Sequence, residues 1–277
     1  MVDGDQIRKL AREVLAEDVG SGDLTADLID SSRMASAHIV CRAPAVICGR
    51  PWFEQVFELL DERVEIAWSV DEAASVEPGT VICQLSGPAR ALLTGERAAL
   101  NLLQTLSGTA TRTHSFVEAI AGTGAQILDT RKTLPGLRQA QKYAVACGGG
   151  SNHRMGLFDA ILIKENHIAL AGSITAAVLK ARALHPGIAV EVETEHLGEL
   201  NEALALGVEW IMLDNYSLAD MREAVRRASG KATLEVSGNV DLGSIRQLAE
   251  TGIDYISAGT LTKDVDAVDL SMSLRPL

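Results

Sequence analysis

The stretch AVEVETEHLGELNEALALGVEWIMLDN, residues 189–215, decides the fold. It begins and ends with short apolar runs of strand length, at residues 189–192 and 210–213, and the segment Leu197 to Leu206 between them has the amphipathic pattern of a helix. Four further apolar runs repeat the pattern, at residues 125–128, 160–163, 233–236 and 254–257. Six such units in series predict an α/β fold with parallel strands and favour a closed or nearly closed barrel over a doubly wound sheet. No G-x-G-x-x-G motif follows any of the runs, so a dinucleotide-binding fold is disfavoured.

The first part of the chain has a different pattern. A helix is expected from Asp3 to Ala16, and short β-branched runs punctuated by proline and glycine follow between Ala35 and Leu93, with a helix near Trp52 to Leu60. Thr94 is the expected cap of a long helix that joins this part to the parallel strands. The sequence therefore predicts two domains.

Composition excludes several classes of protein. The 277 residues are 47% hydrophobic and 22% charged, which is typical of a globular protein, and no apolar run is long enough to span a membrane. The amino end has the charges of Asp3, Asp5 and Arg8 where a secretory signal would be apolar, so we expect a cytoplasmic protein. The four cysteines show no zinc-ligand spacing, and we expect neither disulfides nor structural zinc. A net charge of −12 argues against nucleic acids and anionic membranes as partners.

Polar residues follow each apolar run, where a parallel barrel carries its reactive groups. In chain order they are Asp129 to Thr133, Lys164 to His167, Glu193 with Glu195 after a run that itself contains Glu191, Asp214-Asn215, Ser237-Gly238-Asn239 and Ala258-Gly259-Thr260. His153 and Arg154 lie between the first two groups in the chain, so several cations are expected on neighbouring loops. Without Arg97, Arg131, Lys132, Arg154 and Lys164, 20 basic residues face 37 acidic ones, a net charge of −17. One cationic pocket in an acidic protein would draw small anions inward.

Each of these groups also has a simpler explanation. The pair Arg131-Lys132 alone is typical of a solvated loop, and Lys164 is either one half of an ion pair inside the barrel or a functional ammonium group. Glu193 and Asp214 are either solvated carboxylates or partners of the cations. The last two glycine-containing turns are ordinary turns or a phosphate site.

Taken together, the residues predict a pocket for a substrate that carries carboxylate and phosphate. Arginine binds carboxylates through two parallel hydrogen bonds, whereas lysine acts as a point charge toward phosphate. Glu193 and Asp214 on adjacent strands would suit a hydrated Mg²⁺.

The chain resembles the quinolinate phosphoribosyltransferase family along nearly its whole length. The resemblance is carried by these motifs: residues 17–25 (EDVGSGDLT), 95–101 (GERAALN), 129–133 (DTRKT), 149–154 (GGSNHR), 162–167 (LIKENH), 191–193 (EVE), 213–215 (LDN) and 257–259 (SAG). It implies an amino-terminal α/β sandwich domain over residues 1–108, to which the tail 267–277 returns, and an incomplete α/β barrel over residues 109–266. Two departures, Ser-Gly-Asn at residues 237–239 and Lys263, concern only the phosphate end.

The resemblance also implies the reaction and the roles of the residues. The enzyme would transfer phosphoribose from 5-phosphoribosyl-1-pyrophosphate to quinolinate and release CO₂, and the cofactor would be Mg²⁺ held by Glu193 and Asp214 through water. Lys132, Lys164, Glu193 and Asp214 would be the catalytic residues. The substrate-binding residues would be Arg97, Thr130, Arg131, Lys132, His153, Arg154, Lys164, Glu193, Asp214, Ser237, Gly238, Asn239, Ser257, Gly259 and Thr260. A homodimer is implied, with Arg97 reaching in from the neighbouring subunit, and sometimes a higher assembly.

Three other functions stay open from the sequence. A homologous phosphoribosyltransferase of the molybdenum-operon type would act on another acid and need fewer cations. A Schiff-base lyase would use Lys164 as its nucleophile. A binding or regulatory barrel would hold quinolinate without turnover.

Overall fold

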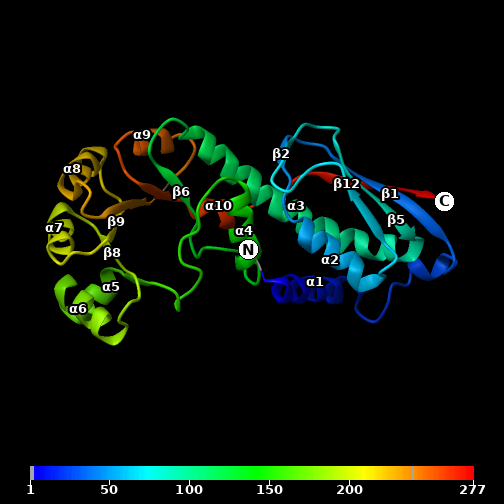
Figure 1. The fold of residues 1–277 in the computed structure, drawn as a ribbon, viewed down its shortest axis with the longest axis horizontal. Helices are drawn as coiled ribbons and strands as arrows, with labels where there is room; N and C mark the ends of the chain where they lie inside the picture. Colours follow the sequence, from blue (N-terminus) through cyan, green and yellow to red (C-terminus); the bar gives the residue numbers. More distant parts are fainter. Residues whose placement is uncertain (1–2, 239) are drawn as a thin grey trace. The chain divides into compact units, whose positions relative to one another are not determined.

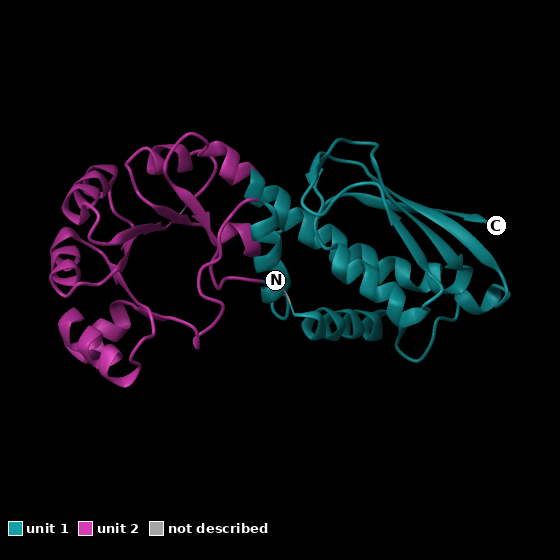
Figure 2. Ribbon diagram, in the orientation of Figure 1, with its two compact units in different colours: residues 1–114, 134–148, 264–277 teal, residues 115–133, 149–263 magenta. Residues whose placement is uncertain are grey.

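The computed structural model describes residues 3–238 and 240–277, which fall into two compact units (Figure 2). Unit 1 comprises residues 1–114, 134–148 and 264–277, and unit 2 comprises residues 115–133 and 149–263. The boundary expected at residues 108 and 109 falls inside one continuous helix, α3 (Ala89–Ala119), and residues 134–148 pack with unit 1. Sequence order alone therefore does not separate the two units.

Unit 1 is built on a four-stranded antiparallel sheet in the order β12-β1-β5-β3. The strands are β1 (Met34–Cys41), β3 (Glu65–Trp68), β5 (Val81–Pro88) and β12 (Leu270–Pro276), and β2 (Ala45–Val46) pairs separately with β4 (Ser75–Val76). The helices are α1 (Gly4–Val19), α2 (Arg50–Leu60), α4 (Arg138–Cys147) and most of α3, with a short 3₁₀ turn at Ala26–Leu28. The carboxyl-terminal strand β12 pairs with β1 from Ala35 opposite Pro276 to Cys41 opposite Leu270.

The core of unit 1 lies between this sheet and its helices (Figure 1). Alternate residues of β1 are buried, as expected for a strand with one face against a core. The helix α2 buries Trp52, Phe53, Val56 and Phe57 on one side, at the spacing of a helical face.

Unit 2 is a parallel sheet whose six strands lie in the order β6-β11-β10-β9-β8-β7 (Figure 1). The strands are β6 (Gln126–Leu128), β7 (Ile161–Ile163), β8 (Val190–Thr194), β9 (Trp210–Asp214), β10 (Thr233–Ser237) and β11 (Tyr255–Ser257). The helices are α5 (Glu165–Ala171), α6 (Ile174–Leu184), α7 (Leu197–Ala205), α8 (Leu218–Ala228), α9 (Ile245–Ala249) and α10 (Thr260–Lys263). Because β6 and β7 are the two ends of the sheet, the barrel is incomplete. The predicted fold class is confirmed, and each of the six apolar runs lies on a strand.

The predicted start of the long helix was wrong. The helix α3 begins at Ala89, so Thr94 lies in its second turn and does not cap it. The Thr94 hydroxyl instead donates a hydrogen bond to the Asp23 carboxylate at 2.8 Å, which ties the helix to the loop after α1. Strand β5 runs directly into α3 at Pro88, and this junction hides the start of the helix from a search for a polar cap.

Among residues 3–238 and 240–277, no single helix is long and apolar enough to cross a membrane. The helices α5 and α6 pass that test only as a pair, and they are bent by 91° at the break between them.

Candidate active site

Unit 2 contains a cavity of about 300 Å³ at the carboxyl ends of its parallel strands. The residues around it are Thr130, Arg131, Lys132, His153, Arg154, Leu162, Lys164, Met212, Glu235, Ser237 and Ser257. The loop after β6 supplies the first three, Lys164 follows β7, and Ser237 and Ser257 end β10 and β11. Parallel strands present their carboxyl ends at one edge of the sheet, which is why residues far apart in the chain meet here. Of the five cations set apart by sequence, Arg131, Lys132, Arg154 and Lys164 line this cavity.

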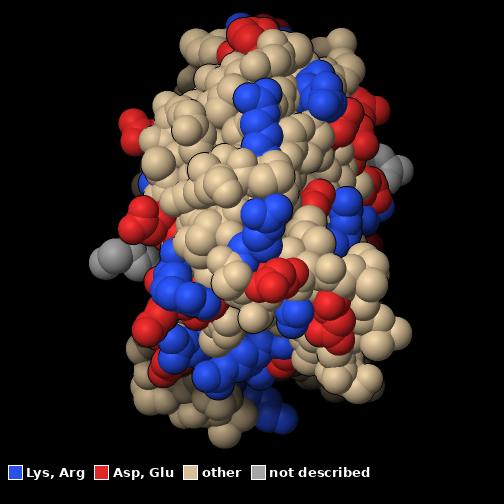
Figure 3. Space-filling view, turned by 90° about the vertical axis from the view of Figure 1, so that its right-hand side faces the viewer, with Lys and Arg blue, Asp and Glu red and all other residues tan. Residues whose placement is uncertain are grey.

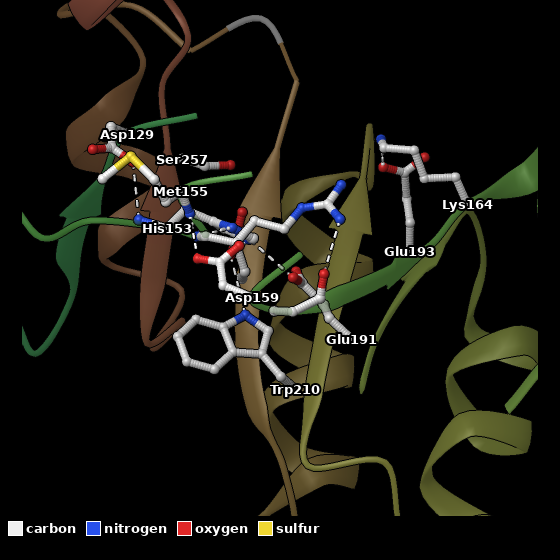
Figure 4. Close-up of polar contacts among 12 residues, drawn as sticks. Asp129, His153, Met155, Asp159, Lys164, Glu191, Glu193, Trp210 and Ser257 are labelled. Atoms are coloured by element: carbon white, nitrogen blue, oxygen red, sulfur yellow. Dashed lines mark hydrogen bonds and ion pairs between the residues drawn. The ribbon is translucent and has the colours of Figure 1, made fainter. Parts of the chain in front are cut away.

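A buried carboxylate fixes the loop that carries His153 and Arg154. Asp129, at the end of β6, is fully buried and accepts a hydrogen bond from Asn152 Nδ2 at 2.6 Å and from the backbone N–H of His153 at 2.9 Å (Figure 4). Ser151 also forms a parallel bridge to Leu128. The loop after the three glycines at residues 148–150 is therefore bound to the sheet.

Two further carboxylates hold the His153 ring from inside the barrel. Its Nε2 atom lies 2.9 Å from Glu191 Oε2 and 3.4 Å from Glu235 Oε2, and Trp210 Nε1 donates to Glu235 at 3.1 Å. Its Nδ1 atom accepts the backbone N–H of Arg154 at 2.7 Å, so Nε2 is the atom that presents a proton to the carboxylates. Both ring nitrogens are engaged, and the ring orientation is fixed (Figure 4).

Burial and charge compete in this cluster. Burial disfavours charge on the ring, but the hydrogen bonds to Glu191 and Glu235 outweigh it and raise the pKa of His153. Burial also raises the pKa of Glu191, to about 7, although His153 lowers it. One ring nitrogen of His153 and one carboxylate oxygen each of Glu191 and Glu235 lie within 4.8 Å of one another. At this separation the three groups can share one proton or surround a metal ion.

Arg154 points into the cavity from a stiffened loop. Its Nη1 atom donates to the carbonyl of Ala160 at 3.1 Å, while the Asp159 carboxylate accepts the backbone N–H groups of Met155 and Gly156 at 2.6 and 2.9 Å. Burial and the neighbouring positive charge of Arg131 lower the pKa of Arg154. Two guanidinium groups held close together in a partly buried cavity favour an anionic ligand.

Lys164 forms an ion pair with Glu193 and also lines the cavity, so the structure is compatible with both interpretations of this lysine. The Lys164 side chain is 42% exposed and that of Glu193 is 8% exposed, so the lysine still reaches the cavity while the carboxylate lies beneath it. Burial raises the pKa of Glu193, the charge of Lys164 opposes this, and Asp214 raises it further.

Two glycines, Gly238 and Gly259, shape the turns at the predicted phosphate end of the site. Gly238 adopts φ +147°, and a Cβ atom there would lie 2.9 Å from Asn215 Oδ1, so this turn requires glycine. A Cβ on Gly259 would lie 2.9 Å from the Lys132 side chain, and Thr260 begins α10 directly after it. Asn239 lies outside the described residues.

Some predicted residues do not line the cavity. Arg97 is an exposed residue of α3 in unit 1. Glu193 and Asp214 lie at the ends of β8 and β9, Glu193 beneath Lys164 and Asp214 accepting from Asn215 Nδ2 at 2.9 Å.

Three acidic residues of the site had no predicted role: Asp129, Glu191 and Glu235. Glu191 and Glu235 stand in the middle of apolar strand runs, where a charged residue is exceptional unless it has a partner. The position of these two glutamates within apolar runs therefore already indicated in the sequence that each needs a partner. Their partner, His153, lies in a loop far along the chain, so only the fold shows the pairing.

Comparison with known proteins identifies the family. Residues 23–107 match the N-terminal domain model of quinolinate phosphoribosyl transferase, and residues 109–273 match its C-terminal domain model. The chain belongs to the quinolinate phosphoribosyltransferase family. It is 42% identical over 270 residues to a probable nicotinate-nucleotide pyrophosphorylase (carboxylating) of Bacillus subtilis, covering 97% of this chain and 93% of that one.

Other members of the family agree in sequence and structure. A quinolinate phosphoribosyltransferase (decarboxylating) of Nicotiana tabacum is 36% identical over 283 residues, covering 94% of this chain and 80% of that one. The solved structure of the nicotinate-nucleotide pyrophosphorylase of Francisella tularensis superposes with a TM-score of 0.97 at 47% identity, covering 99% and 98% of the two chains.

The pairing of Lys164 with Glu193 predicts a pH-dependent loss of stability in the variant Lys164→Met. Without the ammonium, the pKa of buried Glu193 rises further, so its carboxyl keeps a proton in the folded protein at a pH where the unfolded chain has released it. The decrease in the free energy of unfolding should therefore be small at pH 5 and grow to about 1 kcal/mol at pH 8. The expected decrease is no larger because Lys164 is partly exposed and solvent weakens the pair. Urea unfolding midpoints at both pH values measure it.

The exposed Lys231 provides the matched control, since Lys231→Met removes a lysine charge at the surface. That variant should unfold like the unmodified protein at both pH values. An equal loss at pH 5 and pH 8 for Lys164→Met would contradict the role given to Glu193.

Proposed function

We propose that this protein transfers the phosphoribosyl group of 5-phosphoribosyl-1-pyrophosphate to the ring nitrogen of quinolinate, with loss of CO₂, to give nicotinate mononucleotide and pyrophosphate. One observation carries the proposal: Arg131, Lys132, Arg154 and Lys164 line one cavity at the carboxyl ends of the parallel strands. Membership of the family and the names of its relatives support the same reaction.

The two carboxylates of quinolinate occupy the cationic side of the cavity. Arg131 and Arg154 each offer a planar fork of donors, and Lys164 adds a point charge at the end of β7. His153, with both ring nitrogens engaged, lines the same cavity and fixes the position of the Arg154 backbone. Quinolinate, with two adjacent carboxylates on its ring, can contact all of these cationic side chains. An acid with one carboxylate can contact only some of them.

The reaction needs charge placement and no protein nucleophile. Departure of pyrophosphate leaves positive charge on the ribose ring, and carboxylates stabilise that charge. We assign Glu193 and Asp214, at the ends of adjacent strands, to the ribose, and Lys132, which lines the cavity, to the leaving pyrophosphate. We assign the 5′-phosphate to the backbone of the turns at Gly238 and Gly259, which approach Asn215 and Lys132 too closely to carry a side chain.

Glu193 and Asp214 also form a donor set that fits Mg²⁺. Hard oxygen ligands suit this ion, and the two carboxylates lie at the ends of adjacent strands. These residues would hold the ion through water. When bound, it neutralises charge on the departing pyrophosphate.

Decarboxylation follows from the charge of the adduct. Once the pyridine nitrogen carries the ribose it is positively charged, so it accepts the electron pair left when the neighbouring carboxylate departs as CO₂. The protein contributes by holding the ring in place while the charge on this carboxylate is lost.

A second copy of the chain would complete the site with Arg97. This side chain is exposed on α3 and takes part in no ion pair among residues 3–238 and 240–277. Large apolar side chains are exposed in both units, including Leu24 at 85% and Phe158 at 78%. The face in Figure 3 also has broad uncharged areas, with Lys and Arg side chains gathered near its lower end. Exposed apolar side chains such as Leu24 and Phe158 favour association of subunits.

The reaction is tested by incubating the protein with quinolinate, 5-phosphoribosyl-1-pyrophosphate and Mg²⁺. We expect nicotinate mononucleotide and CO₂ in equal amounts, measured by chromatography and by release of label from the 2-carboxylate. Lys164→Ala is the control and should lower the rate strongly. Absence of product from the unmodified protein, while quinolinate still binds, would instead support a binding barrel.

The shared site is tested by mixing two inactive variants, Arg97→Ala and Lys164→Ala. A mixed dimer has one intact site, since Lys164 comes from one subunit and Arg97 from the other, so random exchange should restore about a quarter of the activity. Mixing Lys132→Ala with Lys164→Ala is the matched control and should restore none, because both residues line the same subunit's cavity. If subunits exchange and the first mixture stays inactive, Arg97 does not act across an interface.

A further inference from the structure

Two cysteines that have no role in the proposed reaction converge in unit 1. Cys48 lies between β2 and α2, and Cys147 is the last residue of α4. The two Sγ atoms and a carboxylate oxygen of Glu72 all lie within 4.8 Å of one another. We call Cys48 and Cys147 the thiol pair.

The backbone around the thiol pair is held firmly. The N–H of Cys48 donates to Ser107 Oγ at 2.9 Å, and that hydroxyl donates back to the Cys48 carbonyl at 3.1 Å. Gly49 follows with φ +114°, a conformation that favours glycine. After Cys147, Gly148 packs so closely against α3 that a Cβ would lie 2.4 Å from the carbonyl of Ala110. The short separation of the two sulfurs is therefore built into the fold.

The two thiols differ in exposure and in chemistry. Cys147 is partly exposed and receives hydrogen bonds from the Cys48 thiol and the Tyr143 hydroxyl, which lower its pKa despite partial burial. Cys48 is fully buried, and burial raises its pKa well above the usual value. Cys147 is thus the sulfur that a reagent reaches first, and the buried Cys48 sulfur lies beside it.

The geometry argues against a metal ion at this place. Both oxygens of Glu72 already accept backbone N–H groups at the start of α2, from Gly49 at 2.8 Å and from Arg50 at 3.3 Å. A metal ion would also require Cys48 to lose its proton, which its burial opposes.

The other cysteines, Cys41 and Cys83, are fully buried, and burial raises the pKa of Cys83 to about 12.

We propose that the thiol pair is a reversible modification site for hydroperoxides. The Cys147 thiolate attacks the peroxide O–O bond and becomes a sulfenic acid, while the other oxygen leaves as water after taking up a proton. The Cys48 sulfur then attacks the sulfenic sulfur, a second water leaves, and a disulfide joins residues 48 and 147. The two thiols lose two electrons and two protons in all, and one hydrogen peroxide is reduced to two waters. The modification protects Cys147 from irreversible oxidation.

The test uses the purified full-length protein and hydrogen peroxide as the probe. After exposure, remaining thiols are alkylated under denaturing conditions, and the digest is analysed by mass spectrometry without reduction. We expect a single linked peptide pair containing Cys48 and Cys147, reversed by dithiothreitol. Cys41 and Cys83 should remain alkylated, with Cys147 consumed about tenfold or more faster than Cys83.

Single variants separate the two roles. In Cys48→Ser, dimedone should trap Cys147 as sulfenic acid, and longer exposure should give sulfinic acid. In Cys147→Ser, Cys48 should stay reduced, and the matched control Cys83→Ser should form the same disulfide at the unmodified rate. The proposal is overturned if the unmodified protein gives sulfinic acid at Cys147 without a linked peptide, if all four cysteines oxidise alike, or if the purified protein carries zinc on these thiols.

Discussion

Buried carboxylates at the parallel sheet hold Lys164, the His153 ring and the loop that carries Arg154, and the rest of the arrangement depends on this pairing. Asp129 binds the loop at residues 152–153, Glu191 and Glu235 fix the His153 ring, and Glu193 holds Lys164. Burying a charge costs free energy unless it has a partner, so each carboxylate is stable only with its cation or hydrogen-bond donor in place. Folding of the barrel therefore fixes Lys164 and the His153–Arg154 loop at the edge of the cavity without the help of a ligand.

This arrangement suits a reaction whose transition state differs from its substrates mainly in charge. Groups that are already oriented need no rearrangement when charge develops, and a partly buried cavity strengthens their effect. The surrounding protein is strongly acidic, with a net charge of −12, so the cationic cavity stands out against its surroundings. Small anions are guided to the place where the reaction needs them. The thiol pair lies in unit 1 and shares no residue with this network.

Much of the fold was predictable because each strand of the barrel is a short apolar run with a helix-length segment after it. Arg131, Lys132 and Lys164 were predictable for the same reason, since the residues after such runs meet at one edge of the sheet. The start of α3 was missed because β5 runs directly into it and Thr94 binds Asp23. Glu191 and Glu235 received no role because their partner His153 is brought to them only by the closing of the barrel. The convergence of Cys48 and Cys147 is likewise a contact between distant segments.

The central claim is that several fixed cations share one cavity and recognise two adjacent carboxylates on one ring. The most direct measurement compares the dissociation constants of quinolinate and nicotinate for the unmodified protein by calorimetry, at one pH and salt concentration. Each charge-assisted hydrogen bond lost with the second carboxylate weakens binding, so quinolinate should bind about tenfold or more tightly than nicotinate. Equal affinities for the two acids would show that the second carboxylate meets no cation, and would contradict the account.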